Sequence, residues 1–168
     1  MNNPKEIIAF AMNMEKQGQK FYESFASQVT NPEAKKWFEI LADTEKEHYE
    51  ILEKQYKQLD QDGTWIDLEG MAPENDPALF QQRKEAEEMD PSEQKYSLSD
   101  LSVLRMAYLI ENDFAEYYRK AMDQMEDPDG KRMLNTLFEW ENEHRRLFHD
   151  EYKKAMELNW FEQSFAPF

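Results

Sequence analysis

The sequence contains no cysteine among its 168 residues. Disulfides, thiolate-ligated metals, iron–sulfur clusters and a cysteine nucleophile are therefore all excluded. Glycine is scarce too, with only 4 residues, whereas a third of the chain is charged and Leu, Met, Glu and Lys are common. This composition favours an all-α fold. The length is sufficient for a core that buries about two-thirds of the unfolded surface, so we expect a single domain over residues 1–168.

Basic residues are outnumbered by acidic ones, 20 to 36, which gives a formal net charge of −16. This excess of negative charge argues against nucleic acid or an anionic membrane as a partner. Long hydrophobic runs are also lacking. The apolar stretch near the N-terminus is soon interrupted by Asn13 and Glu15, so it is too short and too polar for a signal peptide or a membrane span. We therefore expect a cytoplasmic protein.

The chain does contain an internal repeat with an offset of 96 residues. Adding 96 to a residue number in the first half gives the same residue type at many positions of the second half, with no gap in the alignment. The matching pairs are Ala11 and Ala107, Glu15 and Glu111, Tyr22 and Tyr118, Pro32 and Pro128, Lys35 and Lys131, Leu41 and Leu137, Glu45 and Glu141, Glu47 and Glu143, His48 and His144, and Tyr56 and Tyr152. The two halves are therefore expected to share one structural unit.

Each repeat has the pattern of a helical hairpin. In the first repeat, apolar residues recur at alternating three- and four-residue steps from about Pro4 to Val29, and again to about Leu59. The stretch "TNPEAKK" separates the two helices, with Asn31 suited to a helix cap and Pro32 to the first helical position.

Two such hairpins predict an all-α four-helix bundle with one long crossover connection. We place the hairpins at residues 4–59 and 99–158. The crossover at residues 60–98 contains Pro73, Pro77 and Pro91, and we expect a short helix near "PALFQQRKEAEEM". Residues 159–168 form an aromatic tail.

Four acidic residues and two histidines interrupt the apolar stripes of the predicted helices: Glu15, Glu45, His48, Glu111, Glu141 and His144. Residues three apart on a helix share a face, so the Glu and the His of each Glu-x-x-His pair point the same way, into the core. Glu45 and Glu141 each follow the lone glutamate of their hairpin by 30 residues. Equal spacing about each turn places the lone glutamate level with the pair, so all six side chains converge at one height.

Four buried carboxylates would repel one another and resist desolvation unless cations balance them. Two divalent cations supply four positive charges, and neutral imidazoles add none. Nitrogen and oxygen ligands without sulfur suit iron or manganese, with zinc as a substitute. The alternative is a bundle that keeps its polar core without metal, through protonated carboxylates or Glu–His hydrogen bonds. The chain has only 3 histidines, and two of them occupy equivalent repeat positions, which favours the metal site.

Two tyrosines near the predicted metal site have two interpretations, and the third histidine has one. Tyr22 and Tyr118 lie two helical turns after the lone glutamates on the same face. They are either core aromatics, or hydrogen-bond donors and radical-quenching groups beside a redox metal site. His149 falls beside the core stripe, and we expect it at the surface.

The arrangement resembles the ferritin-like superfamily of di-iron carboxylate proteins and, within it, the rubrerythrin group. The resemblance covers about residues 4–158 and rests on "AMNMEKQGQKFY", "ADTEKEHYE", "AYLIENDFAEYY" and "EWENEHRRL". It implies that two iron ions are bridged by Glu45 and Glu141. It further implies that one iron is completed by Glu15 and His48, and that the other is completed by Glu111 and His144.

The chain departs from the rubrerythrin pattern at two places. Rubrerythrins usually carry a rubredoxin-like domain with four cysteines, which this chain does not have, so a separate electron-donor protein is expected. They also typically place another glutamate one turn after the helix-three ligand, where this chain has Phe114. The remaining six ligands are closer to the ferroxidase centre of bacterioferritin, but Lys46 stands where the haem-ligating Met of that family would lie, so haem is not expected.

The resemblance implies a di-iron oxidoreductase that reduces peroxide or dioxygen and forms a homodimer or a higher oligomer. Two alternatives remain at this stage. One is iron oxidation and storage in a cage, as in ferritins. The other is a metal-independent helical interaction module that uses the aromatic tail as its contact surface.

Overall fold

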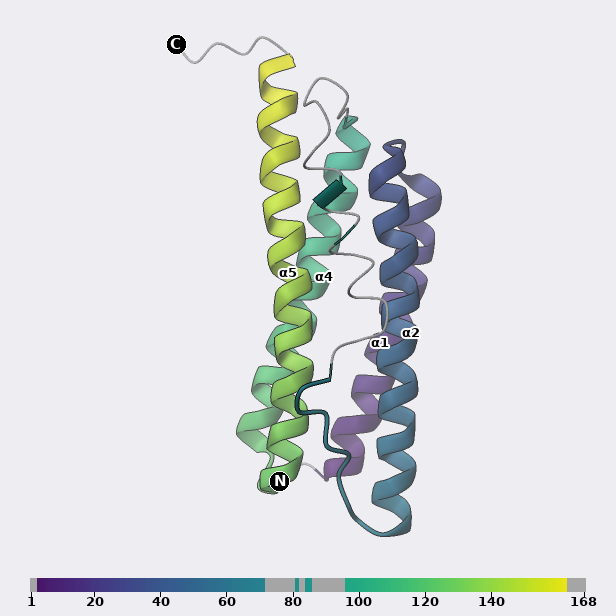
Figure 1. Cartoon of the computed structure of the whole chain (residues 1–168), viewed down its shortest axis with the longest axis vertical. Coiled ribbons are helices and arrows are strands. Elements are labelled where there is room, and N and C mark those ends of the chain that lie inside the picture. Colours follow the sequence, from purple (N-terminus) through teal and green to yellow (C-terminus); the bar gives the residue numbers. More distant parts are fainter. Residues whose placement is uncertain (1–2, 72–80, 82–83, 86–95, 163–168) are drawn as a thin grey trace.

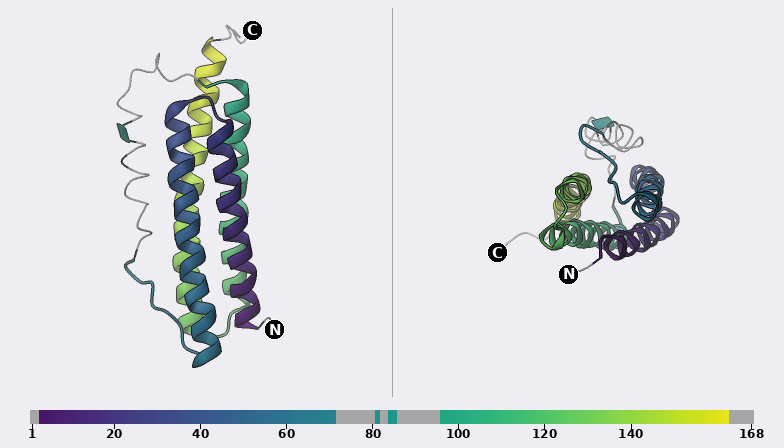
Figure 2. Two further views of the ribbon diagram at one scale, coloured as in Figure 1. Left: turned by 90° about the vertical axis from the view of Figure 1, so that its right-hand side faces the viewer. Right: turned by 90° about the horizontal axis from the view of Figure 1, so that it is seen from below.

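The computed structural model describes residues 3–71, 81, 84, 85 and 96–162, and it confirms the predicted four-helix bundle. The helices are α1 (Pro4–Gln28), α2 (Pro32–Gln61), α4 (Leu98–Gln124) and α5 (Pro128–Glu162). α1 packs on α2 and α4 packs on α5, which gives the two hairpins, and α1 also lies beside α4 (Figures 1 and 2). None of the described helices is long and apolar enough to cross a membrane.

The helix starts follow from local chemistry. The side chain of Asn31 accepts hydrogen bonds from the backbone N–H groups of Glu33 and Ala34, as the sequence predicted. Asp127, its equivalent in the repeat, accepts from the N–H groups of Asp129 and Gly130. These side chains satisfy N–H groups that have no partner within the first turn of a helix. Both hairpin turns are therefore built alike.

The connection between the hairpins begins on the side of α2 and α5. Gln55 of α2 donates to the carbonyl of Thr64 and accepts from the N–H of Ile66, and the indole of Trp140 on α5 donates to the carbonyl of Met71. The short helix that we predicted near residues 77–89 lies almost entirely outside the described residues.

α5 ends later than the sequence suggested. It continues to Glu162, four residues into the segment that we expected to form a tail. Ala155 is buried near its end, and the side-chain amide of Asn159 donates to the carbonyl of Tyr96 at 3.2 Å. The first proline beyond this point is Pro167, so no helix breaker intervenes. Residues 163–168 lie outside the described part of the chain.

The apolar core is divided into two clusters along the bundle. One cluster includes Tyr22, Phe38 and Phe148, whose rings stack on one another. The other includes Leu52 and Tyr118 together with apolar residues of α1 and α5. On every helix, the inward glutamates and histidines fall between the residues that belong to these two clusters. A polar layer therefore crosses the middle of the bundle.

Candidate metal centre

The polar layer contains the six side chains that the repeat singled out. α1 and α4 each supply one glutamate, and α2 and α5 each supply a Glu-x-x-His pair, namely Glu15, Glu111, Glu45 with His48, and Glu141 with His144. All six side chains are 0% exposed. Because the two hairpin turns are alike, the lone glutamate of each hairpin lies level with its Glu-x-x-His pair.

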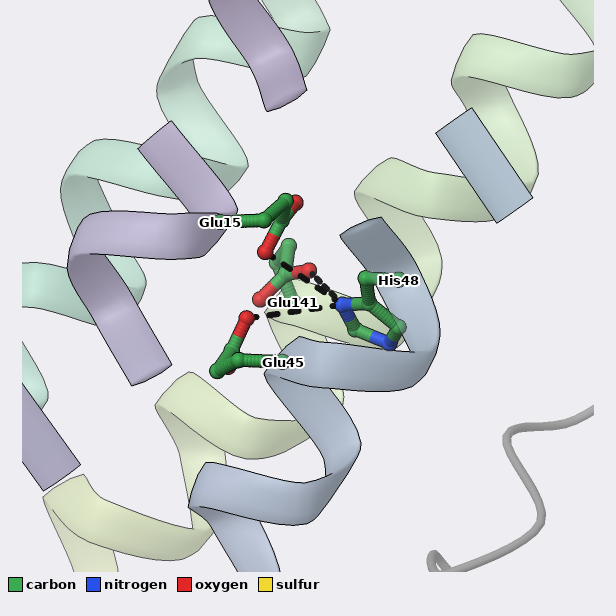
Figure 3. Close-up of side chains that lie close together, drawn as sticks. All are labelled: Glu15, Glu45, His48 and Glu141. Carbon is green, nitrogen blue, oxygen red and sulfur yellow. Dashed lines mark ion pairs between the residues drawn. The ribbon is translucent and has the colours of Figure 1, made fainter. Parts of the chain in front are cut away.

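The first ligand group is centred on the imidazole of His48 (Figure 3). Its Nδ1 atom lies 3.5 Å from Glu15 Oε2, 3.6 Å from Glu45 Oε2 and 2.9 Å from Glu141 Oε1. One donor atom from each of these four residues lies within 4.8 Å of all the others. Three helices, α1, α2 and α5, therefore direct oxygen and nitrogen atoms at one point.

The second group consists of Glu45, Glu111, Glu141 and His144, with donor atoms within 4.8 Å of one another. His144 Nδ1 lies 3.8 Å from Glu111 Oε2 and 3.9 Å from Glu141 Oε2. Glu45 and Glu141 belong to both groups. Two adjacent ligand sets that share two carboxylates have the arrangement of a dinuclear centre.

The donor atoms of these groups are poorly satisfied by the protein alone. Both carboxylate oxygens of Glu45 and Glu141, both ring nitrogens of His48, and one oxygen each of Glu15 and Glu111 have no hydrogen-bond partner among the described residues. The 2.9 Å approach of His48 Nδ1 to Glu141 is an ion-pair distance without the alignment of a hydrogen bond. Each unsatisfied buried polar group costs about 1–3 kcal/mol, and more when it is charged. Oxygen and nitrogen donors without sulfur therefore fit a pair of divalent iron, manganese or zinc ions.

Burial and mutual repulsion raise the pKa of two of these carboxyls. The pKa of Glu45 lies well above 4.5 because of burial first, and then because of the nearby charges of Glu141 and Glu15. Burial also raises the pKa of Glu111, and Glu141 raises it further. Both carboxyls therefore tend to keep their protons when no cation is bound.

Glu141 and His48 behave differently because they form an ion pair. Burial by itself would raise the pKa of Glu141, but the adjacent imidazoles of His48 and His144 outweigh it and lower that pKa. Burial likewise disfavours the charged form of His48, but Glu141 outweighs it and the pKa of His48 is raised. The pair is therefore ionised over the neutral range in the metal-free protein.

Two tyrosines cross between the hairpins to the lone glutamates. The hydroxyl of Tyr22 on α1 donates to Glu111 Oε1 on α4, and the hydroxyl of Tyr118 on α4 donates to Glu15 Oε1 on α1. Both tyrosines are fully buried, and burial is the largest cause that raises the pKa of each hydroxyl. The phenols therefore keep their protons and hold one oxygen of each lone carboxylate, which leaves the other oxygen directed at the centre.

Comparison with protein families agrees with this geometry. The family model described as Rubrerythrin matches residues 6–152 of the chain. The chain belongs to the rubrerythrin family. It is thus a ferritin-like four-helix bundle with a candidate di-metal carboxylate site, and the resemblance drawn from the sequence is confirmed. Searches of curated proteins and of solved structures gave no significant match.

One residue beside the centre of this rubrerythrin-family chain was missed in the sequence. The indole of Trp140 stacks on the imidazole of His48, with ring centroids 5.3 Å apart and planes 25° apart. Its Nε1 donates to the carbonyl of Met71, which fixes the orientation of the indole. The only signal in the sequence was its position directly before Glu141, because its equivalent in the repeat is Thr44 and the 96-residue offset gives no match.

The position that departs from the rubrerythrin pattern is filled by an aromatic ring. Phe114 is buried, and its equivalent in the repeat is Gly18. A Cβ atom on Gly18 would lie 2.7 Å from Cε2 of Phe114 and 3.5 Å from Cγ of Glu45. The ring therefore occupies the space that a side chain on α1 would need, next to Glu45.

The third histidine of the chain, His149, lies at the surface as expected. Its side chain is half-exposed and takes no part in the centre.

Proposed function

We propose that the chain is a di-iron oxidoreductase that reduces hydrogen peroxide or dioxygen with electrons from a separate protein. The observation that supports this most directly is the pair of buried ligand groups that share Glu45 and Glu141. Membership of the rubrerythrin family supports the peroxidase class of reaction. Manganese or zinc are alternative occupants of the same nitrogen and oxygen donors.

Each residue of the layer has a distinct task in this proposal. Glu45 and Glu141 would be shared by the two metals, because each belongs to both groups. Glu15 and His48 would complete the ligands of one metal, and Glu111 and His144 would complete the ligands of the other. The four carboxylates balance two divalent cations, which removes the repulsion that raises the pKa of two of them.

Two bound ferrous ions would supply the two electrons that convert hydrogen peroxide, with two protons, into two molecules of water. The protein's part is to hold the ligands in a dry core and to keep protons on the hydroxyls of Tyr22 and Tyr118 next to the lone carboxylates. These 168 residues contain no cysteine, so a rubredoxin-type or iron–sulfur relay cannot lie within them. We infer that re-reduction uses an electron donor outside these residues.

Metal analysis of protein purified without added metal tests the site. We expect two metal ions per chain, and a loss of both in Glu141→Gln because its carboxylate belongs to both ligand groups. Glu143→Gln is the matched control, since Glu143 lies on the same helix with a half-exposed side chain that pairs with Arg146. Native protein without metal would instead favour the metal-independent interaction module.

Stopped-flow oxidation of the ferrous-loaded protein tests the reaction. We expect faster oxidation by hydrogen peroxide than by dioxygen, and sustained turnover only when a reduced donor such as rubredoxin is added. Faster reaction with dioxygen, together with uptake of many irons per chain in a large cage, would replace this proposal with iron storage.

A further inference from the structure

Three aromatic rings in a row lead from the surface of the bundle into its buried centre. The indole of Trp140 stacks on the imidazole of His48, and that imidazole stacks in turn on the ring of His144, with centroids 6.0 Å and planes 13° apart. Both separations lie within the range of about 4.5–7 Å over which aromatic rings interact. These three residues are called the ring stack below. Because the two histidines belong to different ligand groups, the ring stack reaches both halves of the centre.

Trp140 is the outer ring of the stack. It is 7% exposed, whereas both histidines and both tyrosines that bond the lone glutamates are 0% exposed. Trp140 also lines a cleft of about 720 Å³, together with Met71 of the connection, Met122 of α4 and polar residues of α5. The start of the connection passes from the end of α2 to α5 at this place (Figure 1). The hollow is called the Trp140 cleft below, and its wall is in direct contact with the ligand His48.

The indole contacts His48 through the face of the ring and not through a hydrogen bond. A histidine that binds metal usually donates its second N–H to a carboxylate or a carbonyl, which fixes the ring. Neither ring nitrogen of His48 has such a partner among the described residues. Trp140 is itself held by its hydrogen bond to the carbonyl of Met71 at 3.2 Å. The stack therefore orients the imidazole and places a π-system against it, while both nitrogens stay available.

The internal repeat supplies this outer ring on one side of the centre only. The equivalent of Trp140 is Thr44, whose hydroxyl donates to the carbonyl of Ile40 within its own helix. The six candidate ligands, in contrast, are the same in both repeats. Metal binding places the same demand on both sides of the centre, whereas an entry point for electrons is needed on one side. The asymmetry at Trp140 therefore fits a role in electron entry better than a role in binding metal.

We propose that electrons enter the centre through the ring stack, from the donor protein docked over the Trp140 cleft. The route rests on the proposed function, because it requires a redox-active metal pair and an external donor. Each donor molecule gives up one electron, and two such transfers return two ferric ions to the ferrous state. Trp140 is a bridge that ends unchanged, and no bond forms or breaks within the stack. Since electron transfer weakens steeply with distance, contact from ring to ring favours this route over one across the saturated side chains of the core.

The charges around the cleft are compatible with a docked protein. Its lining contains two acidic and two basic residues, namely Glu69, Glu139, Lys131 and Arg132. They balance one another, although the chain as a whole carries a net charge of −16. Repulsion between like charges opposes the approach of an acidic donor to an acidic surface. A donor can therefore reach the outer end of the ring stack without net repulsion from the residues that line the cleft.

Reduction of the diferric protein by reduced rubredoxin, followed in a single turnover by the absorbance of the ferric centre, tests the route. Trp140→Leu removes the outer ring and should slow this reduction about tenfold or more. Trp140→Phe keeps a ring and should recover most of the rate. Oxidation of the ferrous protein by hydrogen peroxide should be unchanged in both variants, because that step does not use the donor. Trp160→Leu, exposed on α5, is the matched control, and metal content and circular dichroism establish that each variant keeps its centre and fold.

A bulky label in the cleft tests the docking place without any change to the ring stack. The chain has no cysteine, so Asn135→Cys introduces a single thiol in the cleft that a maleimide can label after the protein has folded and bound metal. The label should slow reduction by rubredoxin to the same extent as Trp140→Leu and leave oxidation by peroxide unchanged. Glu50→Cys with the same label is the control, since Glu50 is exposed on α2 and does not line the cleft.

Tryptophan fluorescence gives a readout that does not depend on turnover. Cobalt(II) and zinc bind the same nitrogen and oxygen donors, but only cobalt has the partly filled d shell that quenches an excited indole stacked on a ligand. Cobalt should therefore lower the emission of the wild-type protein relative to zinc, and Trp140→Phe should abolish this difference.

Equal reduction rates in the wild type, Trp140→Leu and the labelled Asn135→Cys would overturn the proposal. The same holds if Trp140→Leu slows reduction and peroxide oxidation alike, because Trp140 would then have a structural role only. A cobalt-dependent loss of emission that persists in Trp140→Phe would also contradict the contact through the stack. A wild-type protein that binds no metal, or whose ferrous form does not react with peroxide, marks instead a failure of the proposed function, which is seen before any variant is made.

Discussion

Removal of metal should make the stability of the protein fall as pH rises above about 5. The pKa values of Glu45 and Glu111 are raised from 4.5, so the unfolded chain loses these two protons before the folded chain does. Folding then requires the uptake of protons that the unfolded chain has already released. The free energy of unfolding therefore falls as pH rises from the pKa of the unfolded carboxyls towards the pKa of the folded ones. The raised pKa of His48 acts in the same direction above its ordinary value of 6.5.

The lowered pKa of Glu141 acts in the opposite direction and at lower pH. Its contribution to stability is present above 4.5 and is lost as pH falls through the folded pKa. A measurement between about pH 5 and pH 7 therefore isolates the raised groups. Each group that keeps its proton only in the folded state contributes a slope of about −1.4 kcal/mol per pH unit. Glu45 and Glu111 together can give a slope of at most about −2.8 kcal/mol per pH unit, which is large beside a total stability of about 5–15 kcal/mol.

Glu45→Gln removes one of these groups and keeps its shape. At pH 7 the metal-free variant should be more stable than the metal-free wild type by up to about 3 kcal/mol, because the pKa of an unfolded glutamate lies about 2.5 units below pH 7 and the pKa of folded Glu45 is raised. The same variant should fail to hold its metals. Glu50→Gln, exposed on the same helix, is the matched control and should change neither property.

Urea unfolding followed by far-ultraviolet circular dichroism, after removal of metal with a chelator and at one protein concentration, gives the required free energies. A free energy of unfolding that stays constant from about pH 5 to pH 7 would show that the buried carboxyls do not retain protons. Equal stabilities of Glu45→Gln and Glu50→Gln at pH 7 would refute the same reasoning independently.

Three further predictions concern the surroundings of the centre. Gly18→Ala should destabilise the fold by about 1–3 kcal/mol, because its Cβ meets the ring of Phe114, and adding Phe114→Leu should recover part of this loss in a double-mutant cycle measured by urea unfolding. Tyr22→Phe and Tyr118→Phe should each lower metal affinity about tenfold or more in competition titrations, whereas purely apolar packing roles would leave the affinity unchanged. Phe114→Glu should raise the ratio of the peroxide to the dioxygen oxidation rate in stopped-flow experiments, with Phe114→Leu as the control; an unchanged ratio would mean that the missing glutamate does not set the preference.

The bundle and the set of inward polar residues were predictable because helices impose a regular spacing. Glu45 and His48 necessarily share a face, and two hairpins with equivalent turns bring their inward residues to one level. These relations depend only on position along a helix and on the repeat. The start of α2 at Pro32 was predictable for the same local reason, since Asn31 is a strong cap.

Contacts between helices were less accessible from the sequence. The stack of Trp140 on His48 and the approach of Phe114 to Gly18 depend on which helices are neighbours and on how they are tilted. Neither quantity follows from the period of an apolar stripe. The sequence likewise left the two interpretations of Tyr22 open, because a hydroxyl bonded to Glu111 on another helix and a plain core aromatic have the same spacing on α1.

The division of the candidate ligands between the hairpins determines when during synthesis the proposed metal centre can form. The first ligand group takes three residues from the N-terminal hairpin and Glu141 from the other, and the second takes three from the C-terminal hairpin and Glu45 from the first. Neither hairpin contains a complete group. A chain still being translated therefore has no finished site until the last helix has left the ribosome and docked. If the two groups hold metal as proposed, metal loading is a late event in biogenesis, and polypeptides truncated before α5 should not bind the metal.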